Sequence, residues 1–285
     1  MAERLAYHLV VNALEARTGW TPIARFSSAV SCVINGHAPY QRYFAAGRAR
    51  TAEGMGSQSI ERLVLDWLST DVNPSVQTMR MLTNPSNAIR AYNSYNASAR
   101  LAVKTSVSKL EDLAAPTQSI KPKRELFTDL EDPEPCRTGS LTVLEALLSV
   151  VEDNARQRKA HGLINLSAIA TRLGVEFSAA AEIAMVFEAN GHTPVADAAS
   201  TLGCHSRTLQ RRLRDEGTNA ETVRQAVRLT SALNKLGSMD SLTNIAHDVG
   251  FSDSAHMSRS FQASCGMPPS LLRNLIRADR TEDTC

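Results

Sequence analysis

The sequence predicts a mostly α-helical protein built in two parts. Apolar residues recur at helical spacing almost without interruption from about residue 140 to Arg277, and four prolines gather just before that stretch, between residues 114 and 139. The length of 285 residues is enough for two domains with separate cores. Hydrophobic residues make up 43% of the chain and charged residues 21%, close to the globular average, which argues against a disordered or fibrous chain.

Residues 1–113 are predicted to form an α-rich N-terminal region with a regulatory or self-association role, and the pattern does not identify its fold. Helical periodicity is visible in three segments, from Leu5 to Ala16, from Ile60 to Leu68 and from Ala88 to Leu110. The second is the clearest, because its apolar residues fall at i, i+3, i+4, i+7 and i+8 and form one stripe. The stretch from Phe26 to Ile34 reads instead as a strand.

Residues 114–139 are predicted to be a proline-rich linker. Their four prolines stand among charged and small polar residues, a composition that buries too little apolar area to offset the entropy lost on ordering. Residues 140–181 follow as a helical connector. Its first helix carries its leucines and valine on one face: Leu141, Leu144, Leu147, Leu148 and Val151.

The composition also limits the compartment and the chemistry. The chain has no run of eighteen apolar residues and no apolar signal segment after its first methionine, so we expect a cytoplasmic protein. The five cysteines are scattered singly, which argues against disulfides and a zinc site, and no nucleotide-binding or hydrolase motif is present. We therefore expect no metal, no cofactor and no enzymatic activity. The net charge is only +2, but residues 191–280 hold 11 Lys and Arg against 8 Asp and Glu.

A first helix-turn-helix pattern surrounds Gly203. Small and apolar residues from Val195 to Leu202 suit a closely packed helix, and glycine supplies the positive φ of a tight turn. In the helix that follows, Leu209 and Leu213 are predicted to face inward. Four polar side chains are predicted to face outward: Arg207, Gln210, Arg211 and Arg214. Arginine matches guanine edges and glutamine matches adenine edges in the major groove, so this helix has the chemistry of a recognition helix.

The same pattern returns 47 residues later, around Gly250. Ser241 is the expected N-cap of its first helix, and Asp253 is the expected N-cap of its second. In the second helix, Met257 and Phe261 are predicted to face inward. The outward set is Ser254, Ala255, His256, Ser258 and Arg259. Between the two units, residues 221–236 carry apolar side chains at helical spacing and are predicted to form a stiff spacer helix.

In these motifs, residues 182–278 resemble the DNA-binding domain of AraC/XylS-type transcription regulators. The resemblance rests on Leu202-Gly203, Arg207 to Leu213, Val227-Arg228-Leu229 with Ala232-Leu233, Ile245-Ala246 with Val249-Gly250-Phe251, Arg259-Ser260-Phe261, and Gly266 to Ser270. It implies DNA contacts from Arg207, Gln210 and Arg211 in the first unit, and Arg214 faces the same way. In the second unit it implies contacts from Ser254, Ala255, His256 and Arg259. One departure is His205, which stands where the family usually has serine.

The resemblance implies a sequence-specific regulator that binds double-stranded DNA and activates transcription through RNA polymerase. Repression by occlusion is an alternative, and so is an architectural or mobile-element protein that bends DNA. Because both units lie in its C-terminal part, a fragment of residues 176–285 is expected to bind DNA alone. Some regulators with this module also transfer alkyl groups to a cysteine in Pro-Cys-His-Arg, but Pro135-Cys136-Arg137 lacks the histidine that would act as base.

Overall fold

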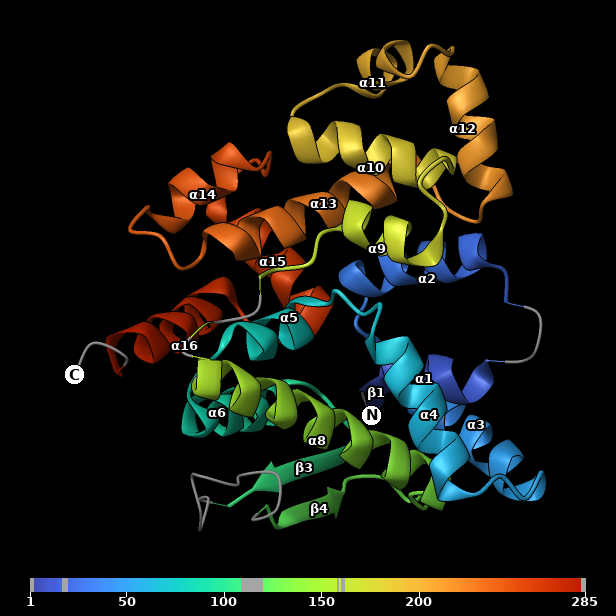
Figure 1. Cartoon of the computed structure of the whole chain (residues 1–285), viewed down its shortest axis with the longest axis vertical. Helices are drawn as coiled ribbons and strands as arrows, with labels where there is room; N and C mark the ends of the chain where they lie inside the picture. Colours follow the sequence, from blue (N-terminus) through green and yellow to red (C-terminus); the bar gives the residue numbers. More distant parts are fainter. Residues whose placement is uncertain (1–2, 17–19, 109–119, 158, 160–161, 283–285) are drawn as a thin grey trace.

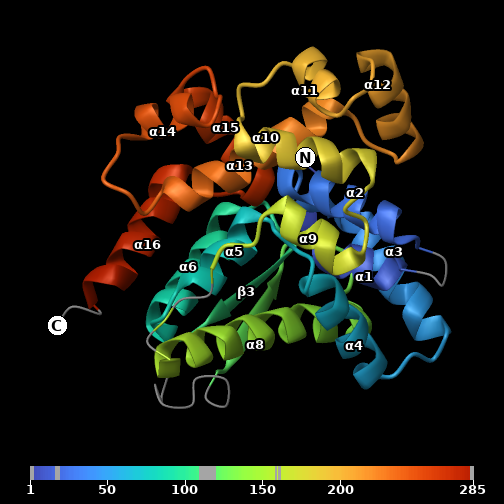
Figure 2. The same ribbon diagram turned by 45° about the horizontal axis from the view of Figure 1, so that its top comes forward.

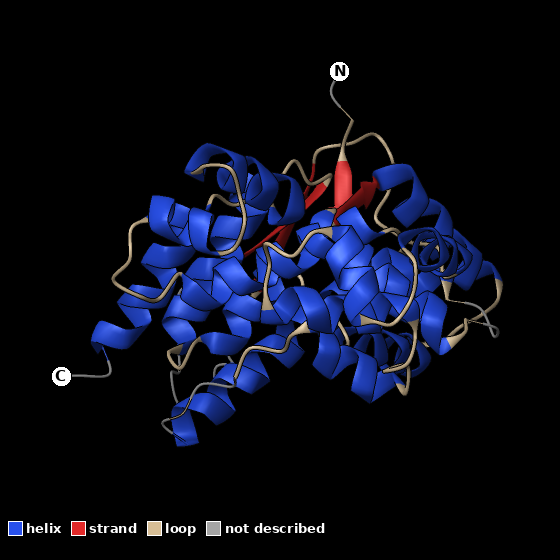
Figure 3. Cartoon of the chain, turned by 90° about the horizontal axis from the view of Figure 1, so that it is seen from above, coloured by secondary structure: helices blue, strands red, loops and turns tan. Residues whose placement is uncertain are grey.

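The computed structural model describes residues 3–16, 20–108, 120–157, 159 and 162–282. The described chain is mostly helical, as predicted, and its strands are confined to one small region (Figure 3). The helices of the N-terminal half are α1 (His8–Glu15), α2 (Pro22–Ile34), α3 (Tyr40–Ala52), α4 (Ser57–Leu68), α5 (Pro74–Met81), α6 (Pro85–Ser98) and α8 (Glu134–Gln157). Those of the C-terminal half are α9 (Leu166–Leu173), α10 (Ala179–Ala189), α11 (Val195–Thr201), α12 (Ser206–Asp215), α13 (Ala220–Lys235), α14 (Leu242–Asp248), α15 (Ser254–Cys265) and α16 (Pro269–Glu282).

Four short strands form two antiparallel pairs in the described chain. Strand β1 (Leu5–Tyr7) pairs with β2 (His37–Pro39), and β3 (Val103–Val107) pairs with β4 (Pro122–Leu126). Both pairs lie in the N-terminal half, and Figure 1 shows β3 and β4 beside the long helix α8. The predicted helix from Ala88 to Leu110 is therefore right only as far as α6, which ends at Ser98. The β-branched residues Val103, Thr105 and Val107 favour the strand that follows.

Two hydrophobic cores hold the molecule together. One lies among α1, α3, α4 and α6, and α8 supplies its central apolar stripe, including Leu144, Leu148 and Val151. The other lies among the C-terminal helices around α13. Helix α2, from the N-terminal half, crosses to this second core, where Figure 1 shows it beneath α9 and α10.

The helical state of α2 corrects the prediction of a strand from Phe26 to Ile34. Thr21 caps the helix, since its hydroxyl oxygen accepts a hydrogen bond from the Ala24 amide at 3.1 Å, and Pro22 follows at the first helical position. Phe26, Val30 and Val33 then fall at i, i+4 and i+7, and all three are fully buried against α13 and its neighbours. Packing of this face outweighs the strand preference of its β-branched residues.

The segment predicted as a linker contains regular structure. Within residues 114–139, β4 completes a hairpin with β3, and α8 begins at Glu134, so that Cys136 is already fully buried in the N-terminal core. Residues 114–119 lie outside the described part of the chain. The division of the chain into four segments stays a prediction.

Buried polar contacts join the two halves. The Asn73 side-chain amide donates to the backbone carbonyl oxygen of Ser264, on α15, at 3.0 Å, and the Gly36 amide donates to the same oxygen at 2.9 Å. A Cβ at Gly36 would lie 2.0 Å from that oxygen, so the close approach requires glycine. On α16, the Asp279 carboxylate accepts hydrogen bonds from the Thr83 and Asn84 backbone amides at 2.7 and 3.0 Å. The two halves therefore form one packed unit.

Candidate nucleic-acid interface

The first predicted helix-turn-helix unit is formed by α11 and α12. Gly203 turns the chain between them with φ of +66°, which is the left-handed conformation that the pattern predicted. On α12, Leu209 and Leu213 are fully buried against the C-terminal core, as predicted. These two side chains fix which face of α12 is turned to solvent.

The polar face of α12 is exposed. Four polar side chains are exposed to solvent: Arg207, Gln210, Arg211 and Arg214. Within the described chain, one hydrogen bond involves the guanidinium groups of the three arginines, from the Arg214 Nε to the Gln210 carbonyl oxygen at 3.3 Å. The neighbouring Arg212 differs, because its guanidinium pairs with the Glu182 carboxylate at 2.9 Å. Arg212 is therefore held by the protein, whereas the guanidinium groups of Arg207 and Arg211 are accessible to a ligand.

The second unit is formed by α14 and α15, with Gly250 between them at φ of +93°. The Ser241 hydroxyl oxygen accepts from the Asn244 amide at 3.0 Å and caps α14, and the Asp253 carboxylate accepts from the His256 amide at 2.6 Å and caps α15. Both caps confirm the prediction. The hydrogen bond from the His256 backbone amide and a second from the Ser252 hydroxyl lower the pKa of Asp253, so it stays ionised at the positive end of the helix.

The outward residues of α15 differ in their exposure to solvent. Ala255 and Arg259 are exposed, whereas Ser254 and His256 are half-buried. The His256 ring is held in place, because its Nδ1 lies 3.1 Å from the Ser252 hydroxyl oxygen and its ring meets that of Phe251 edge-on at 5.2 Å. Arg259 is therefore the most accessible charged group on this helix.

Helix α13 sets the relation between the two units. Its N-terminal end follows α12 and its C-terminal end leads into α14, so that α12 and α15 lie toward opposite ends of it (Figure 2). Helix α10 packs against α11, α12 and α13, and α15 packs against α13. The predicted spacer helix thus connects the two units and sets the distance between them.

Two arginines of α13 are turned to the protein rather than to solvent. The Arg224 guanidinium lies over the Phe187 ring, 4.5 Å from its centroid. Arg228 is half-buried beneath the second turn, where a Cβ at Gly250 would lie 2.9 Å from its Nε. The pKa of Arg228 is lowered, because its burial outweighs the opposite effect of the Glu221 carboxylate, which lies 3.8 Å from the guanidinium. Gly250 is thus required by its φ, and the Gly191 carbonyl oxygen, 3.3 Å from the same Cβ position, leaves little room for a side chain.

Helix α12 has no side-chain cap. His205 is the N-cap residue of α12, with extended backbone angles, and its side chain makes no capping hydrogen bond. This is the position at which the sequence departs from the AraC/XylS-type pattern that it resembles, so the departure has a local structural consequence. The first turn of α12 is instead closed by the His205 carbonyl oxygen, which accepts from the Thr208 and Leu209 amides at 2.9 and 3.1 Å.

The sequence did not reveal that α2 supports the first unit. The Ser27 hydroxyl donates to the Glu216 carbonyl oxygen at 2.6 Å, at the end of α12. The Glu216 carboxylate in turn accepts from the Ala179 and Ala180 amides at 2.7 and 2.9 Å, at the start of α10. The spacing of Phe26, four residues before Val30, was the available signal for this helix.

The remaining alternatives concern metals, membranes and Cys136. No group of three or more His, Cys, Asp or Glu residues in the described ranges is placed to hold a metal ion. Among the described helices, none is long and apolar enough to cross a membrane. Cys136 is fully buried, and burial raises the pKa of its thiol, which is the opposite of what a nucleophilic cysteine requires.

Comparison with known proteins bears on these C-terminal helices. Residues 198–275 match a family model described as a helix-turn-helix domain, of the AraC type. No curated protein matches the sequence. The crystal structure of the transcriptional regulator CdpR from Pseudomonas aeruginosa is similar over 81% of this chain and 90% of its own length, with 17% identity and a TM-score of 0.32. Residues 198–275 are therefore similar to a helix-turn-helix domain of the AraC type, which supports a DNA-binding transcription regulator.

Proposed function

We propose that this protein reads two adjacent major-groove segments of double-stranded DNA, one with α12 and one with α15. The observation that carries the proposal is the exposed polar face of α12, held outward by the burial of Leu209 and Leu213. Arg207 and Arg211 lie one helical turn apart on that face, and each is suited to a bidentate contact with guanine. Gln210 is suited to adenine, and Arg214 to the phosphate backbone.

In the second unit, Arg259 is the proposed charged contact of α15. The exposed Ala255 suits an apolar contact with a thymine methyl group. Ser254 and His256 are assigned contacts at the groove edge, because both side chains are half-buried. Mounting on one helix, α13, fixes the separation of the two units, so the recognised sites should have one spacing.

We further propose that the protein activates transcription by contacting RNA polymerase, with the N-terminal region as the regulatory part. The support is the resemblance of residues 182–278 to AraC/XylS-type regulators. Repression would follow instead if the bound site overlapped the promoter, and DNA bending without polymerase contact would make the protein architectural.

In vitro selection with the full chain, followed by genome-wide mapping of bound sites and a promoter reporter, tests these assignments. We expect one motif with two parts at fixed spacing, and affinity that falls steeply with salt because arginine contacts release counterions, with a slope of about −0.9 per phosphate contact. Higher reporter output with the protein supports activation. Lower output makes it a repressor, and a selection without any preferred sequence overturns the DNA-reading proposal.

A further inference from the structure

A cysteine, a histidine and a carboxylate meet where α1, α2 and the segment before α5 come together. Cys32 lies on α2, His8 begins α1, and Asp71 lies between α4 and α5. All three line one small space of about 10 Å³, which is about the least that a water molecule needs. The fold thus brings a nucleophilic atom next to a possible acid–base pair, and none of the three residues belongs to the proposed DNA contacts.

The His8 ring carries two protons. Its Nδ1 lies 2.8 Å from the Gly36 carbonyl oxygen, and its Nε2 lies 3.1 Å from the Asp71 carboxylate. A carbonyl oxygen and a carboxylate can only accept hydrogen bonds, so both ring nitrogens donate and the ring is an imidazolium. The pKa of His8 is raised well above its usual value, because burial, which lowers it, is outweighed by the negative charges of ionised Cys32 and Asp71 and by hydrogen bonding to both.

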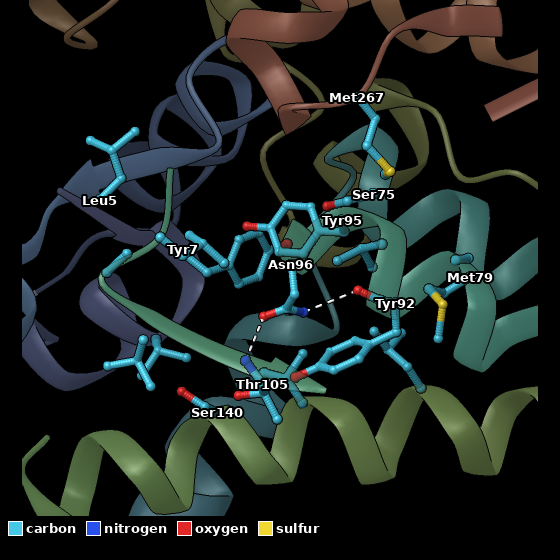
Figure 4. A pocket seen from close by; sticks show the side chains of 18 of the residues that line it. Leu5, Tyr7, Ser75, Met79, Tyr92, Tyr95, Asn96, Thr105, Ser140 and Met267 are labelled. Carbon is cyan, nitrogen blue, oxygen red and sulfur yellow. Dashed lines mark hydrogen bonds between the residues drawn. The ribbon is translucent and has the colours of Figure 1, made fainter. Parts of the chain in front are cut away.

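Asp71 is held in place as the anion of this pair. Its Oδ2 accepts from the Tyr7 hydroxyl and its Oδ1 from the Asn73 amide, both at 2.8 Å. The pKa of Asp71 is lowered, because burial, which raises it, is outweighed by His8 and by these hydrogen bonds. Tyr7 meets Tyr95 edge-on, with ring centroids 5.8 Å apart, in the tyrosine-lined pocket to which all five tyrosines of the chain contribute (Figure 4). The pair is therefore fixed before any reaction.

The Cys32 sulfur has a hydrogen-bond donor and positive charge around it. The Asn12 side-chain amide donates to the sulfur at 3.2 Å, and such a bond is stronger to a thiolate than to a thiol. The pKa of Arg42, on α3, is raised by its hydrogen bond to Glu15 against the effect of burial, and to a smaller extent by Cys32, so a second cation acts on the sulfur. Surroundings of this kind make a cysteine nucleophilic.

The sulfur can also be reached from solvent. Cys32 is half-buried and forms no disulfide, whereas Cys136 and Cys265 are fully buried and burial raises the pKa of both their thiols. Cys32 lines an open groove of about 470 Å³ between α2, α3 and the residues that follow α12. Three serines of α2 line the same groove: Ser27, Ser28 and Ser31. A small polar molecule can therefore approach the sulfur.

We propose that Cys32 is a site of oxidation by hydroperoxides, at which His8, held by Asp71, stabilises the attacking thiolate. The sulfur attacks one peroxide oxygen, so that an S–O bond forms as the O–O bond breaks. The sulfur loses two electrons and becomes a sulfenic acid, and the peroxide is reduced. The leaving hydroxide takes a proton from the solvent in the groove and departs as water. Each chain consumes one peroxide, so the reaction is a modification and not a turnover.

Oxidation is tested on the full chain with hydrogen peroxide and dimedone, a reagent that traps sulfenic acids, followed by mass spectrometry of the peptides. Cys204 is the internal reference, because it is also half-buried but packs against the C-terminal core. The dimedone adduct should form at Cys32 faster than at Cys204 by about tenfold or more. Equal rates at the two cysteines, or no adduct at Cys32, overturns the proposal.

The role of His8 is tested by the rate at which iodoacetamide alkylates Cys32 at pH 6 and at pH 8. Ionisable groups surround the groove and the sulfur on several elements: His8, Glu15, His37, Arg42, Asp71 and Glu216. Burial and His8 lower the pKa of His37 to about 4, so His37 stays neutral in this range. The Glu216 carboxylate is bound by the Ala179 and Ala180 amides. His8 is therefore the group to remove.

Two variants weaken the stabilisation of the thiolate. His8→Asn removes the charge, and its amide can still donate to the Gly36 carbonyl oxygen. It should lower the ratio of the rate at pH 6 to the rate at pH 8 by about fivefold or more, because less thiolate is present at the lower pH. Asn12→Leu removes the donor to the sulfur and should change the ratio in the same direction. Ser28→Ala is the matched control, since it deletes only the other acceptor of the Asn12 amide, at 3.4 Å, and should leave the ratio unchanged.

Circular dichroism and melting curves establish that each variant folds. His8→Asn breaks a buried ion pair, so Asn12→Leu, a change at a half-buried side chain, carries the test if the first variant does not fold. An unchanged ratio in the folded variants refutes the role of His8 and Asn12 and overturns the proposal. Fast alkylation without a dimedone adduct overturns the oxidation step. Because these measurements use no DNA, their outcome is independent of the proposed DNA-reading function.

Discussion

The side-chain amide of Asn73 donates a 2.9 Å hydrogen bond to the Cys32 carbonyl oxygen and a 3.0 Å hydrogen bond to the Ser264 carbonyl oxygen. The same side chain accepts from the Ser75 amide at 3.0 Å and so caps α5. One fully buried residue thus joins the end of α2, the start of α5 and the end of α15. The N-terminal and DNA-binding halves share this contact, and their stabilities should be linked through it.

Replacing Asn73 by Ser should therefore destabilise the whole protein. Serine can still cap α5 but cannot reach both carbonyl oxygens. The Ser264 oxygen keeps the Gly36 amide as a donor, whereas the Cys32 oxygen loses its donor from Asn73, and a buried acceptor left without a donor costs about 1–3 kcal/mol. The matched control is Asn165→Ser, since Asn165 caps α9 through the Ala168 amide at an exposed site. Urea denaturation should give a loss for Asn73→Ser and a change within about 0.5 kcal/mol for the control. Equal losses would mean that only capping matters.

Helix α2 should be needed for the DNA-binding domain to fold. Phe26 is fully buried in the C-terminal core, so Phe26→Ala should cost about 3–5 kcal/mol, while Ile23→Ala on the exposed side should cost much less. Because α2 completes this core, we revise the expectation from the sequence that residues 176–285 bind DNA alone: the fragment should fold poorly by itself and gain helicity when a peptide of residues 20–35 is added. Circular dichroism measures both. A stable fragment that binds the selected DNA without the peptide would refute this.

The parts of this structure that could be predicted from the sequence are set by local rules. Three predicted features depend only on residues close in the chain: the glycine turns, the serine and aspartate caps, and the buried leucines four residues apart on α12. The exposed positions of Arg207 and Arg211 follow from that helical spacing. Their contacts with DNA remain a prediction.

The parts that could not be predicted depend on residues far apart in the chain. The pairing of β3 with β4 and the tyrosine-lined pocket require the tertiary arrangement, which periodicity does not encode. The strand prediction for α2 failed because Val30 and Val33 favour strands locally, whereas packing against α13 decides their conformation. Thr21 and Pro22 indicate the start of a helix, but these two residues alone did not outweigh the strand-like pattern that follows.

Giving α12 a side-chain cap should stabilise the protein. His205 has extended backbone angles suited to an N-cap but makes no capping bond, so His205→Ser should add about 1 kcal/mol to the free energy of unfolding. Ser241→Ala should remove a similar amount, since it deletes the existing cap of α14. Denaturation by urea compares the two. No gain from His205→Ser would show that the first turn of α12 is already satisfied by solvent.

Stability should fall below pH 6.5 in a way that depends on His37. Burial and the neighbouring His8 lower the pKa of His37 to about 4, so between pH 6.5 and 4 the unfolded chain binds a proton that the folded chain does not. Stability is therefore lost as the pH falls through that window, by at most about 3 kcal/mol. His37→Gln should lose less between pH 7 and 5 in urea denaturation. An identical loss would remove His37 as the cause.

Two adjacent arginines of α12 differ in their partners and should respond differently to replacement. Arg211 is exposed on the proposed DNA-reading face, whereas Arg212 is paired with Glu182. Arg211→Ala should cost about 1–3 kcal/mol of binding to the selected duplex and should relax base preference at one position. Arg212→Ala should alter stability and leave that preference unchanged. A third variant, Arg228→Ala, should weaken binding to all sequences alike or lower stability, because the half-buried Arg228 side chain packs against the turn at Gly250.

The measurement is the Kd of each variant for the selected duplex and for its single-base variants, with melting curves to establish folding. A base-specific contact loses discrimination at one position, since only there did the guanidinium distinguish guanine from the other bases. A phosphate contact weakens binding evenly and reduces the salt dependence by about one counterion. Even weakening by Arg211→Ala would therefore make Arg211 a backbone contact, and Arg207 would then be the arginine left to read bases from α12.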